Sequence, residues 1–394
     1  NKWHVREKAW FTVEGATGEQ ILNAVAGNSN GVLALSSNQT QLLNLTGHQN
    51  LIIGAQDGHQ ITYGTADQTL QANTAKQWLL GGGGGELIVE ALLNDKDATL
   101  VLGNAYTSGT VTLKNTNNKI GFINFEGLVT LKYEDHAALG EASINLTYGN
   151  RVMGSEDTMK LLPTTAAGTM LLDKLEGTDI NLRESHHASL YLGAAGNTVY
   201  TGTITTEDDT YRLGGSTGVL SLQQSLAGNR NLSVDAQHYS GGAIELLSKA
   251  QLTGNVTVMG YDSSQTQTTG GDITLRLSAE DALAAAASVS LKEGGILDVN
   301  GNAQHFKDLS MEAGSALIDS SPDRNASVTV AISANKGTTD LLGKVEVGSL
   351  DLTIGQGTTT NLGNAVLANS LTKKGEGTLP LNLTTAFTGD ISIE

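Results

Sequence analysis

One pentapeptide in the sequence has the spacing of a serine nucleophile. Gly214, Gly215, Ser216, Thr217 and Gly218 form a G-x-S-x-G string. In hydrolases this string holds a reactive serine on a sharp turn between a strand and a helix. The flanking sequence, TYRLGGSTGVLSLQQ, predicts a strand on both sides instead. We therefore interpret the string as a turn between two strands, and we expect no catalytic residue and no enzymatic activity.

The histidines and clustered carboxylates, which could bind a metal ion, are also poorly arranged for that role. His186 and His187 stand beside Glu184, but adjacent residues on a strand point to opposite faces. The segments 94–97 and 206–210 carry clustered carboxylates, and neither matches a complete calcium-binding loop. The absence of cysteine excludes a thiolate metal site, a disulfide framework and a cysteine nucleophile. We expect no metal ion and no cofactor.

Composition narrows the classes of partner. The 394 residues carry a formal net charge of -17, and only 16% of them are charged. A surface that reads phosphates needs clustered Lys and Arg, so we expect no nucleic-acid partner. No run of apolar residues approaches the 18 needed for a membrane-spanning helix, so we expect no transmembrane segment.

Short strands are the elements that must position any functional side chain. Runs of four to six residues alternate between apolar and polar side chains, and Gly, Asn, Asp or Ser separate them. Examples are GVLALSS, ATLVLGN, GTVTLKN, ASINLTY, NVTVMG, DITLRLS and SVTVAIS. The pattern persists along the whole chain without a change in composition, and there are only 3 prolines. These features predict an all-β protein and favour a β-solenoid over a sandwich.

A solenoid with about 20–25 residues per turn would make on the order of 16–19 turns from this chain. We expect less than about 15% helix. The best helix pattern is the alanine-rich segment from Leu277 to Leu291, and VREKAWF and TAKQWLL are ambiguous. The five consecutive glycines from Gly81 to Gly85 predict either a flexible protrusion or a tight bend between turns.

The end of the chain carries the sharpest motif. LTKKGEGTLPLNLTTAFTGDISIE resembles the passenger-associated repeat of autotransporters of Gram-negative bacteria. The matching positions are Lys373, Gly375, Gly377, Thr378, Leu379, Leu381, Phe387, Thr388, Gly389 and Ile391. The segment from Gly294 to Ile318, GGILDVNGNAQHFKDLSMEAGSALI, resembles a second common passenger motif.

This resemblance implies the passenger domain of an AIDA-type autotransporter. The implied fold is a right-handed, three-stranded parallel β-helix, formed by residues 1–394 as a single domain. It also implies display on the bacterial cell surface by a C-terminal outer-membrane barrel outside this chain, or release by cleavage. On this view the sequence stops within its pattern because it was cut before the last turns and the barrel.

Places where charged and aromatic residues occur together are candidates for a binding site. Basic residues that could line a groove are Lys114, Lys119, Arg151 and Arg183. Three mixed clusters supply further candidates: Lys132, Tyr133 and Asp135; Asp208, Asp209, Tyr211 and Arg212; and Asp319, Asp323 and Arg324.

Three functions remain open at this point. The resemblance implies an adhesin that binds host extracellular matrix proteins, such as fibronectin, or glycosaminoglycans. Flat faces rich in Thr and Asn would suit self-association, which leads to bacterial aggregation and biofilm. A polysaccharide-processing enzyme would need paired carboxylates, or a basic residue beside an acidic metal site, on one face of adjacent turns.

Overall fold

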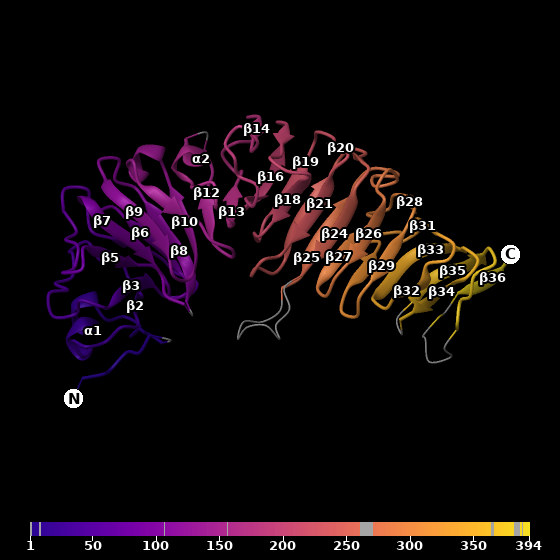
Figure 1. Cartoon of the computed structure of the whole chain (residues 1–394). Helices are drawn as coiled ribbons and strands as arrows, with labels where there is room; N and C mark the ends of the chain where they lie inside the picture. Colours follow the sequence, from indigo (N-terminus) through magenta and orange to yellow (C-terminus); the bar gives the residue numbers. More distant parts are fainter. Residues whose placement is uncertain are drawn as a thin grey trace. The chain divides into compact units, whose positions relative to one another are not determined.

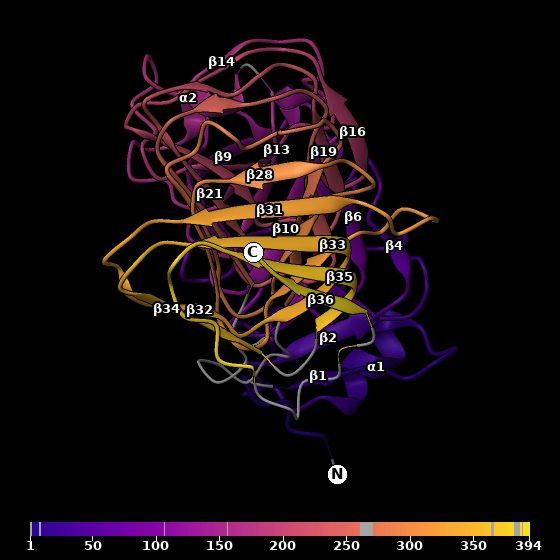
Figure 2. The ribbon, with the colours of Figure 1, turned by 90° about the vertical axis from the view of Figure 1, so that its right-hand side faces the viewer.

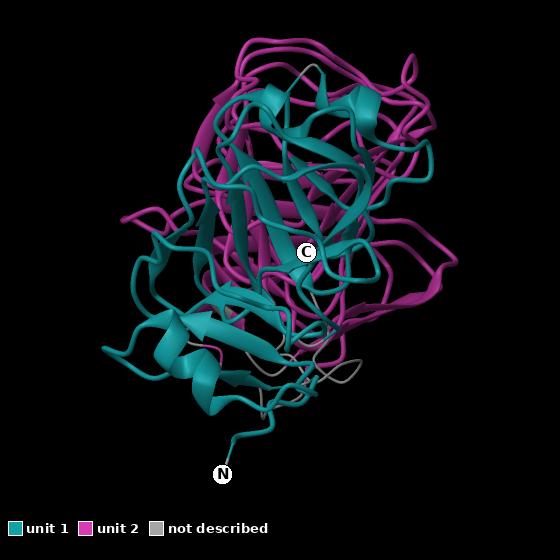
Figure 3. Ribbon diagram, turned by 90° about the vertical axis from the view of Figure 1, so that its left-hand side faces the viewer, with its two compact units in different colours: residues 1–170 teal, residues 171–394 magenta. Residues whose placement is uncertain are grey.

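The computed structural model is a parallel β-solenoid of about 16 turns with 4% helix, as the strand pattern predicts. It describes residues 2–7, 9–105, 107–155, 157–260, 271–363, 366–381, 387 and 389–394. The chain divides into two compact units, unit 1 from Asn1 to Met170 and unit 2 from Leu171 to Glu394 (Figures 1 and 3). Within each unit, strands from successive turns lie side by side and pair in parallel.

Unit 1 contains two sheets. Sheet I is formed by β1 (Trp10–Phe11), β2 (Val32–Leu35), β3 (Ile52–Ala55), β5 (Gln77–Leu80), β7 (Asn94–Leu102), β9 (Lys119–Phe125) and β11 (Ser143–Asn145). Sheet II is formed by β4 (Gln60–Tyr63), β6 (Glu86–Val89), β8 (Ser108–Leu113), β10 (Leu128–Tyr133), β12 (Arg151–Met153) and β13 (Thr169–Leu171). The third side of each turn is mostly loop, with local pairing such as that between Thr69 and Leu92.

Unit 2 contains two long sheets. Sheet III is formed by β15 (Tyr191–Gly193), β18 (Thr210–Gly214), β21 (Asn231–Asp235), β24 (Asn255–Met259), β26 (Ser288–Leu291), β29 (Leu309–Met311), β32 (Gly337–Leu341) and β34 (Thr358–Leu362). Sheet IV is formed by β16 (Asn197–Tyr200), β19 (Val219–Leu222), β22 (Gly242–Leu246), β25 (Ile273–Leu277), β27 (Gly295–Asp298), β30 (Ala316–Ile318), β33 (Lys344–Ile354) and β35 (Val366–Lys374).

The third side of unit 2 completes a three-stranded turn. Its strands are β14 (Ile180–Asn181), β17 (Ile204–Thr205), β20 (Ala227–Gly228), β23 (Gln251–Leu252), β28 (Gln304–Phe306), β31 (Ser327–Ile332) and β36 (Asp390–Ile393). β33 and β35 are long enough to run through two sides, so that β33 pairs with β30 near its start and with β31 further along. Figure 2 shows β31, β33, β35 and β36 lying one beside the next.

The core consists of aliphatic side chains stacked from turn to turn. In sheet II, Leu87, Val111, Leu131 and Val152 occupy equivalent positions in successive strands, and all four are fully buried. Burying a side chain of this size contributes about 1.5–3 kcal/mol. Because each ladder repeats this burial at every turn, the solenoid is stable without disulfides.

Helices are few and short. α1 (Gly18–Ala24) is preceded by its N-cap residue Thr17, which forms a capping box with Gln20 and so satisfies two free backbone N–H groups. The other helices in the described part of the chain are the 3-10 helix η1 (His136–Leu139) and α2 (Thr158–Leu161). Among the described residues, no helix has the length and apolar character to cross a membrane.

The helix predicted for 277–291 is wrong. β25 ends at Leu277, a series of turns follows, and β26 begins at Ser288. Backbone groups in this segment bond to neighbouring turns: Ala282 N donates to the side-chain oxygen of Gln304 at 3.0 Å, and Ala282 O accepts from Ala250 N at 2.9 Å. These contacts replace the bonds of a helix, so tertiary pairing outweighs the helix propensity of alanine.

The five-glycine stretch is a tight bend rather than a protrusion, and it is buried except at Gly84. Gly81 to Gly84 have φ between 83° and 97°, a conformation that other residues rarely adopt. A Cβ on Gly83 would lie 2.5 Å from the carbonyl oxygen of Ala55 and 2.9 Å from the Cβ of Ala34. Glycine is therefore required here both by the backbone conformation and by the close approach of neighbouring turns.

Candidate functional site

The outer face of sheet III carries two continuous rows of mostly polar residues, which we call the polar face. In β18, β21, β24 and β26, buried apolar residues alternate with residues that face the solvent. Parallel register places the outward residues of neighbouring strands beside one another. The first row is Thr210, Asn231, Asn255, Ser288, Asp308, Thr338 and Thr359, and the second is Arg212, Ser233, Thr257, Ser290, Ser310, Asp340 and Asn361.

Hydrogen bonds run along both rows. In the first row, the Asn231 Oδ1 atom accepts from the backbone N of Asn255 at 2.9 Å, and Ser288 Oγ donates to Asn255 Oδ1 at 2.8 Å. In the second row, Ser310 Oγ donates to Ser290 Oγ at 3.2 Å. Hydroxyl and amide groups can make several hydrogen bonds each. The polar face therefore offers both donors and acceptors to a partner.

At one end of the polar face, an ion pair neutralises the charge. The Arg212 guanidinium donates to both carboxylate oxygens of Asp208, at 2.9 and 2.7 Å. This bidentate pair lowers the pKa of Asp208 and raises that of Arg212. The structure thus brings together Asp208 and Arg212, two of the predicted binding residues, but each is occupied by the other.

Towards the other end, a shallow depression of about 390 Å³ lies over Ser288, Ser290 and Ser310. Its border carries two ion pairs, Lys292 with Glu312 and Lys336 with Asp308, and the carboxylate of Asp340, which accepts a hydrogen bond from Asn361 at 2.8 Å. Between Arg212 and this depression, the second row contains only the uncharged residues Ser233 and Thr257. The centre of the polar face is therefore uncharged.

Lys114, predicted for the basic groove, and Lys132, predicted as part of a mixed cluster, lie along the outer face of sheet II in unit 1. Lys114 lies 3.0 Å from a carboxylate oxygen of Glu134 and 3.8 Å from one of Glu90. The hydrogen bond and charge of Glu134, with Glu90 adding to them, raise the pKa of the Lys114 ammonium group. Lys132 lies 3.8 Å from Glu86. Both lysines therefore stand within a charge-balanced ladder.

Glu86 shows how this ladder is held. Partial burial alone would raise the pKa of Glu86. Hydrogen bonds from Thr112 at 2.5 Å and Gln60 at 2.8 Å, together with the charge of Lys132, outweigh burial and lower the pKa. The carboxylate is therefore held ionised by its neighbours on β4, β8 and β10.

The remaining basic candidates do not join this cluster. Lys119 is exposed at the start of β9 in sheet I, where it pairs in register with Asn94 of β7. Arg151 begins β12 and pairs in register with Thr130 of β10. Arg183 is exposed in a loop of unit 2. The structure therefore does not gather the four predicted groove residues on one strand face.

The two predicted tyrosines point inward. Tyr133 is 3% exposed, and its hydroxyl lies 2.5 Å from Thr158 Oγ1. Tyr211 is 6% exposed, and its hydroxyl donates to the carbonyl oxygen of Ala227. Burial raises the pKa of Tyr133. Both rings pack inside the solenoid, so neither presents its face to a partner.

Several predicted acidic residues bind the backbone. Asp135 accepts from the N–H of Ala137 at 2.9 Å and caps η1. Asp319 is buried and accepts from the N–H groups of Gly301, Ser321 and Ala326. Burial opposes the ionised form of Asp319, but these hydrogen bonds outweigh it and lower the pKa. Both carboxylates stabilise local turns.

The candidates that remain exposed lie in loops of unit 2. Asp209 and Asp323 are exposed. Arg324 is exposed too and forms an ion pair with Glu346 of β33. These positions offer single charges rather than a shaped site.

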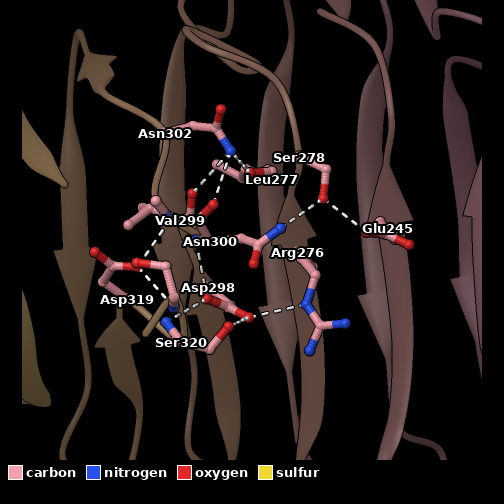
Figure 4. Close-up of polar contacts among 12 residues, drawn as sticks. Glu245, Arg276, Leu277, Ser278, Asp298, Val299, Asn300, Asn302, Asp319 and Ser320 are labelled. Atoms are coloured by element: carbon pink, nitrogen blue, oxygen red, sulfur yellow. Dashed lines mark hydrogen bonds and ion pairs between the residues drawn. The ribbon is translucent and has the colours of Figure 1, made fainter. Parts of the chain in front are cut away.

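Beside Asp319 lies a buried network that the sequence analysis did not single out (Figure 4). Asp298 is 1% exposed. It accepts from Arg276 Nε at 2.9 Å, from Ser320 Oγ at 2.7 Å and from the backbone N of Asn300 at 3.0 Å. These bonds occupy both carboxylate oxygens, so the network ties adjacent turns of sheet IV together and is not set up for acid–base chemistry.

The serine string is a turn, as expected. β18 ends at Gly214 and β19 begins at Val219, with no helix between them. Ser216 is buried, and its Oγ accepts from the backbone N of Ala194 at 3.1 Å. His186 is exposed whereas His187 is buried. In the described parts of the chain, no three His, Cys, Asp or Glu residues are arranged to hold a metal ion.

The polar face is thus the site that the sequence analysis did not locate by residue. The sequence pattern that indicates this face is present in the segments NLSVD, NVTVM and SVSL, where polar and apolar residues alternate. Equivalent residues are 24, 33 and 20 positions apart. This irregular spacing hides the rows until the strands are paired.

Neither a protein-family model, nor a curated protein, nor a solved structure matches this chain.

Proposed function

We propose that this chain is a surface-displayed binding solenoid, an adhesin of the autotransporter-passenger type, and that the polar face contacts its partner. Two things support this: the motifs between Gly294 and Ile391 that resemble those of passenger domains, and the parallel solenoid fold. Thr388, one of the motif residues, lies outside the described residues. The proposed location is the bacterial cell surface, or the medium after cleavage.

The observation that carries the proposal is the neutral centre of the polar face. A polyanion such as a glycosaminoglycan would need unpaired basic residues along its path. Lys114 and Lys132 are paired with glutamates, and the chain has a net charge of -17. Hydroxyl and amide rows instead suit an uncharged, extended partner that can exchange hydrogen bonds with them. We therefore favour a matrix protein segment over a glycosaminoglycan as the host ligand.

Self-association is the second candidate, because the polar face is chemically self-complementary. Asn231, Asn255 and Ser290 can both donate and accept hydrogen bonds. The same rows on a second copy could therefore pair with them in a two-fold arrangement, where each copy contributes the same patch.

Binding to matrix proteins and glycosaminoglycans at two salt concentrations, with sedimentation of the same samples, tests the proposal. We expect saturable binding to a matrix protein that changes little with salt, or a concentration-dependent dimer. Ser290→Arg, in the centre of the polar face, should weaken either association at least tenfold. Thr353→Arg is the matched control, because Thr353 is an exposed strand residue on β33, away from sheet III.

Two results would overturn the proposal. One is binding to no matrix protein by a chain that also stays monomeric. The other is equal loss of binding in Ser290→Arg and Thr353→Arg, which would place the contact elsewhere.

A further inference from the structure

The thioethers of methionine are the only sulfur groups in this chain, because it contains no cysteine. The five methionines are Met153, Met159, Met170, Met259 and Met311. Each thioether can take up one oxygen atom and become a sulfoxide, which is polar. None of the five belongs to the two rows of the polar face. The fold decides which of them an oxidant reaches.

The five methionines differ in how far solvent reaches them. Met153, Met170 and Met311 are 9%, 0% and 1% exposed. Met159, on α2, is half-buried. Met259 is 38% exposed and is the most accessible of the five. A dissolved oxidant can meet Met259 in the folded chain, whereas it meets a buried methionine only when the solenoid opens locally, at a cost in free energy.

Strand pairing fixes the position of Met259. It is the last residue of β24, which pairs with β21 on one side and with β26 on the other. Met259 is in register with Asp235, and its carbonyl oxygen accepts from Ala236 N at 3.0 Å. Residues two apart on a strand share a face, so Met259 follows Thr257 on the outer side of sheet III. It therefore lies at the edge of the polar face.

The fold tolerates a sulfoxide at Met259 better than at the buried methionines. A sulfoxide oxygen accepts hydrogen bonds, and a buried acceptor without a partner destabilises a core. Met170 and Met311 lie within the core, where a sulfoxide would be such an acceptor. At Met259 water can solvate the oxygen. Oxidation there leaves the chain folded and adds one acceptor beside Thr257.

We propose that Met259 is a modification site, at which an oxidant of the peroxide class converts the thioether into a sulfoxide. A sulfur lone pair attacks one oxygen of hydrogen peroxide, the O–O bond breaks, and the other oxygen leaves as water. The sulfur is thereby oxidised by two electrons. Two thiols reverse the step, because they form a disulfide and release the oxygen as water. The proposal does not depend on the adhesin function.

Timed exposure of the full chain to hydrogen peroxide, with the sulfoxide at each methionine measured by mass spectrometry of its peptides, tests the proposal. We expect Met259 to react at least about tenfold faster than Met153, Met170 and Met311, because those three wait for local opening. Met159 should react at an intermediate rate. In urea, where the fold no longer protects any of them, the five rates should converge. Circular dichroism should remain native after Met259 alone has reacted.

Met259→Leu removes the sulfur and keeps the size of the side chain, so the fastest oxidation should vanish in this variant. The matched control is Met159→Leu, which should keep it. A methionine sulfoxide reductase with a dithiol should return oxidised Met259 to the thioether. Three results would each overturn the proposal: Met259 reacting no faster than the buried methionines, Met159 reacting before Met259, or the same order of rates in urea.

Discussion

The outer faces of sheets II and III both carry rows of polar side chains that bond across neighbouring strands, but the residue types differ. On sheet II, Glu86 and Lys132, and Lys114 with Glu134, form a ladder of opposite charges. On sheet III, Asn255, Ser290 and their neighbours form rows without charge at the centre. Charged side chains find their partners in the neighbouring strands and leave little for a ligand. Small hydroxyl and amide groups keep hydrogen-bonding capacity that a second molecule can use.

The comparison depends on both sheets holding a fixed register. In unit 1, the bend at Gly81 to Gly84 sets where β6 begins relative to β5, and hence where Glu86 lies. In unit 2, the network around Asp298 ties β25, β27 and the loop after β30 together. Changing these two features should disturb each unit more strongly than changing the outer faces.

The largest effect is expected for Gly83→Ala. The new Cβ would combine an unfavourable positive φ with contacts of 2.5 Å to Ala55 O, which together should destabilise unit 1 by about 3 kcal/mol. Urea unfolding, with hydrogen exchange at β5 and β6, measures it. Gly58→Ala is the control: Gly58 also has a positive φ, but no atom lies within 4 Å, so about 1 kcal/mol is expected. Equal losses would show that packing at the bend is unimportant.

Asp298→Ala should have the next largest effect. It would leave the backbone N–H groups of Asn300 and Ser320, and the guanidinium of Arg276, without their acceptor. Because Arg276 is partly solvated, we expect a loss of about 2–3 kcal/mol in the free energy of unfolding. Urea unfolding of unit 2 measures this loss. The exposed Asp323 provides the control, since Asp323→Ala should change stability by less than about 0.5 kcal/mol.

Acid should weaken sheet II through Glu86. The folded-state pKa of Glu86 lies below its ordinary value of 4.5, so the ionised carboxylate stabilises the fold above that pH. This contribution is lost as the pH falls through the lowered pKa. Glu86→Gln should therefore flatten the decline in unfolding midpoint between neutral pH and the acid range. Ser290→Ala, on the polar face, should show the same decline in unfolding midpoint with falling pH as the native chain. If Glu86→Gln also showed the native decline, the stabilising role given to the Glu86 carboxylate would be wrong.

The smallest effect is expected for Lys114→Met, which removes one charge from an exposed ladder. Pairs of this kind contribute little because water screens them. The loss of stability should be measurable at low salt and should vanish near about 1 M salt, where the screening length is about 3 Å. Thr257→Ala on the polar face should show no such salt dependence. If Thr257→Ala also lost stability in a salt-dependent way, the outer faces of sheets II and III would not differ in their electrostatics as described.

Local patterns in the sequence predicted the strands well and the helices poorly. Alternation in segments such as NVTVM survives in the structure because the same side chains face the core at every turn. The alanine run from Ala282 to Ala286 has a high helix propensity, but it is buried between turns and bonds to Gln304 and Ala250 instead. α1 was not predicted, although Thr17 and Gln20 form its capping box, because a helix of only 7 residues carries little periodic signal.

By itself, the sequence determined that this protein is an all-β solenoid stabilised by stacked aliphatic side chains, since period-two alternation and turn residues act locally. Only the tertiary structure decided which outward residues become neighbours. Residues that stack on one another are 20 to 33 positions apart, and the length of each intervening turn sets that distance. For the same reason, Lys114 and Lys132 turned out to be paired with glutamates, while the neutral rows on sheet III emerged only from strand register.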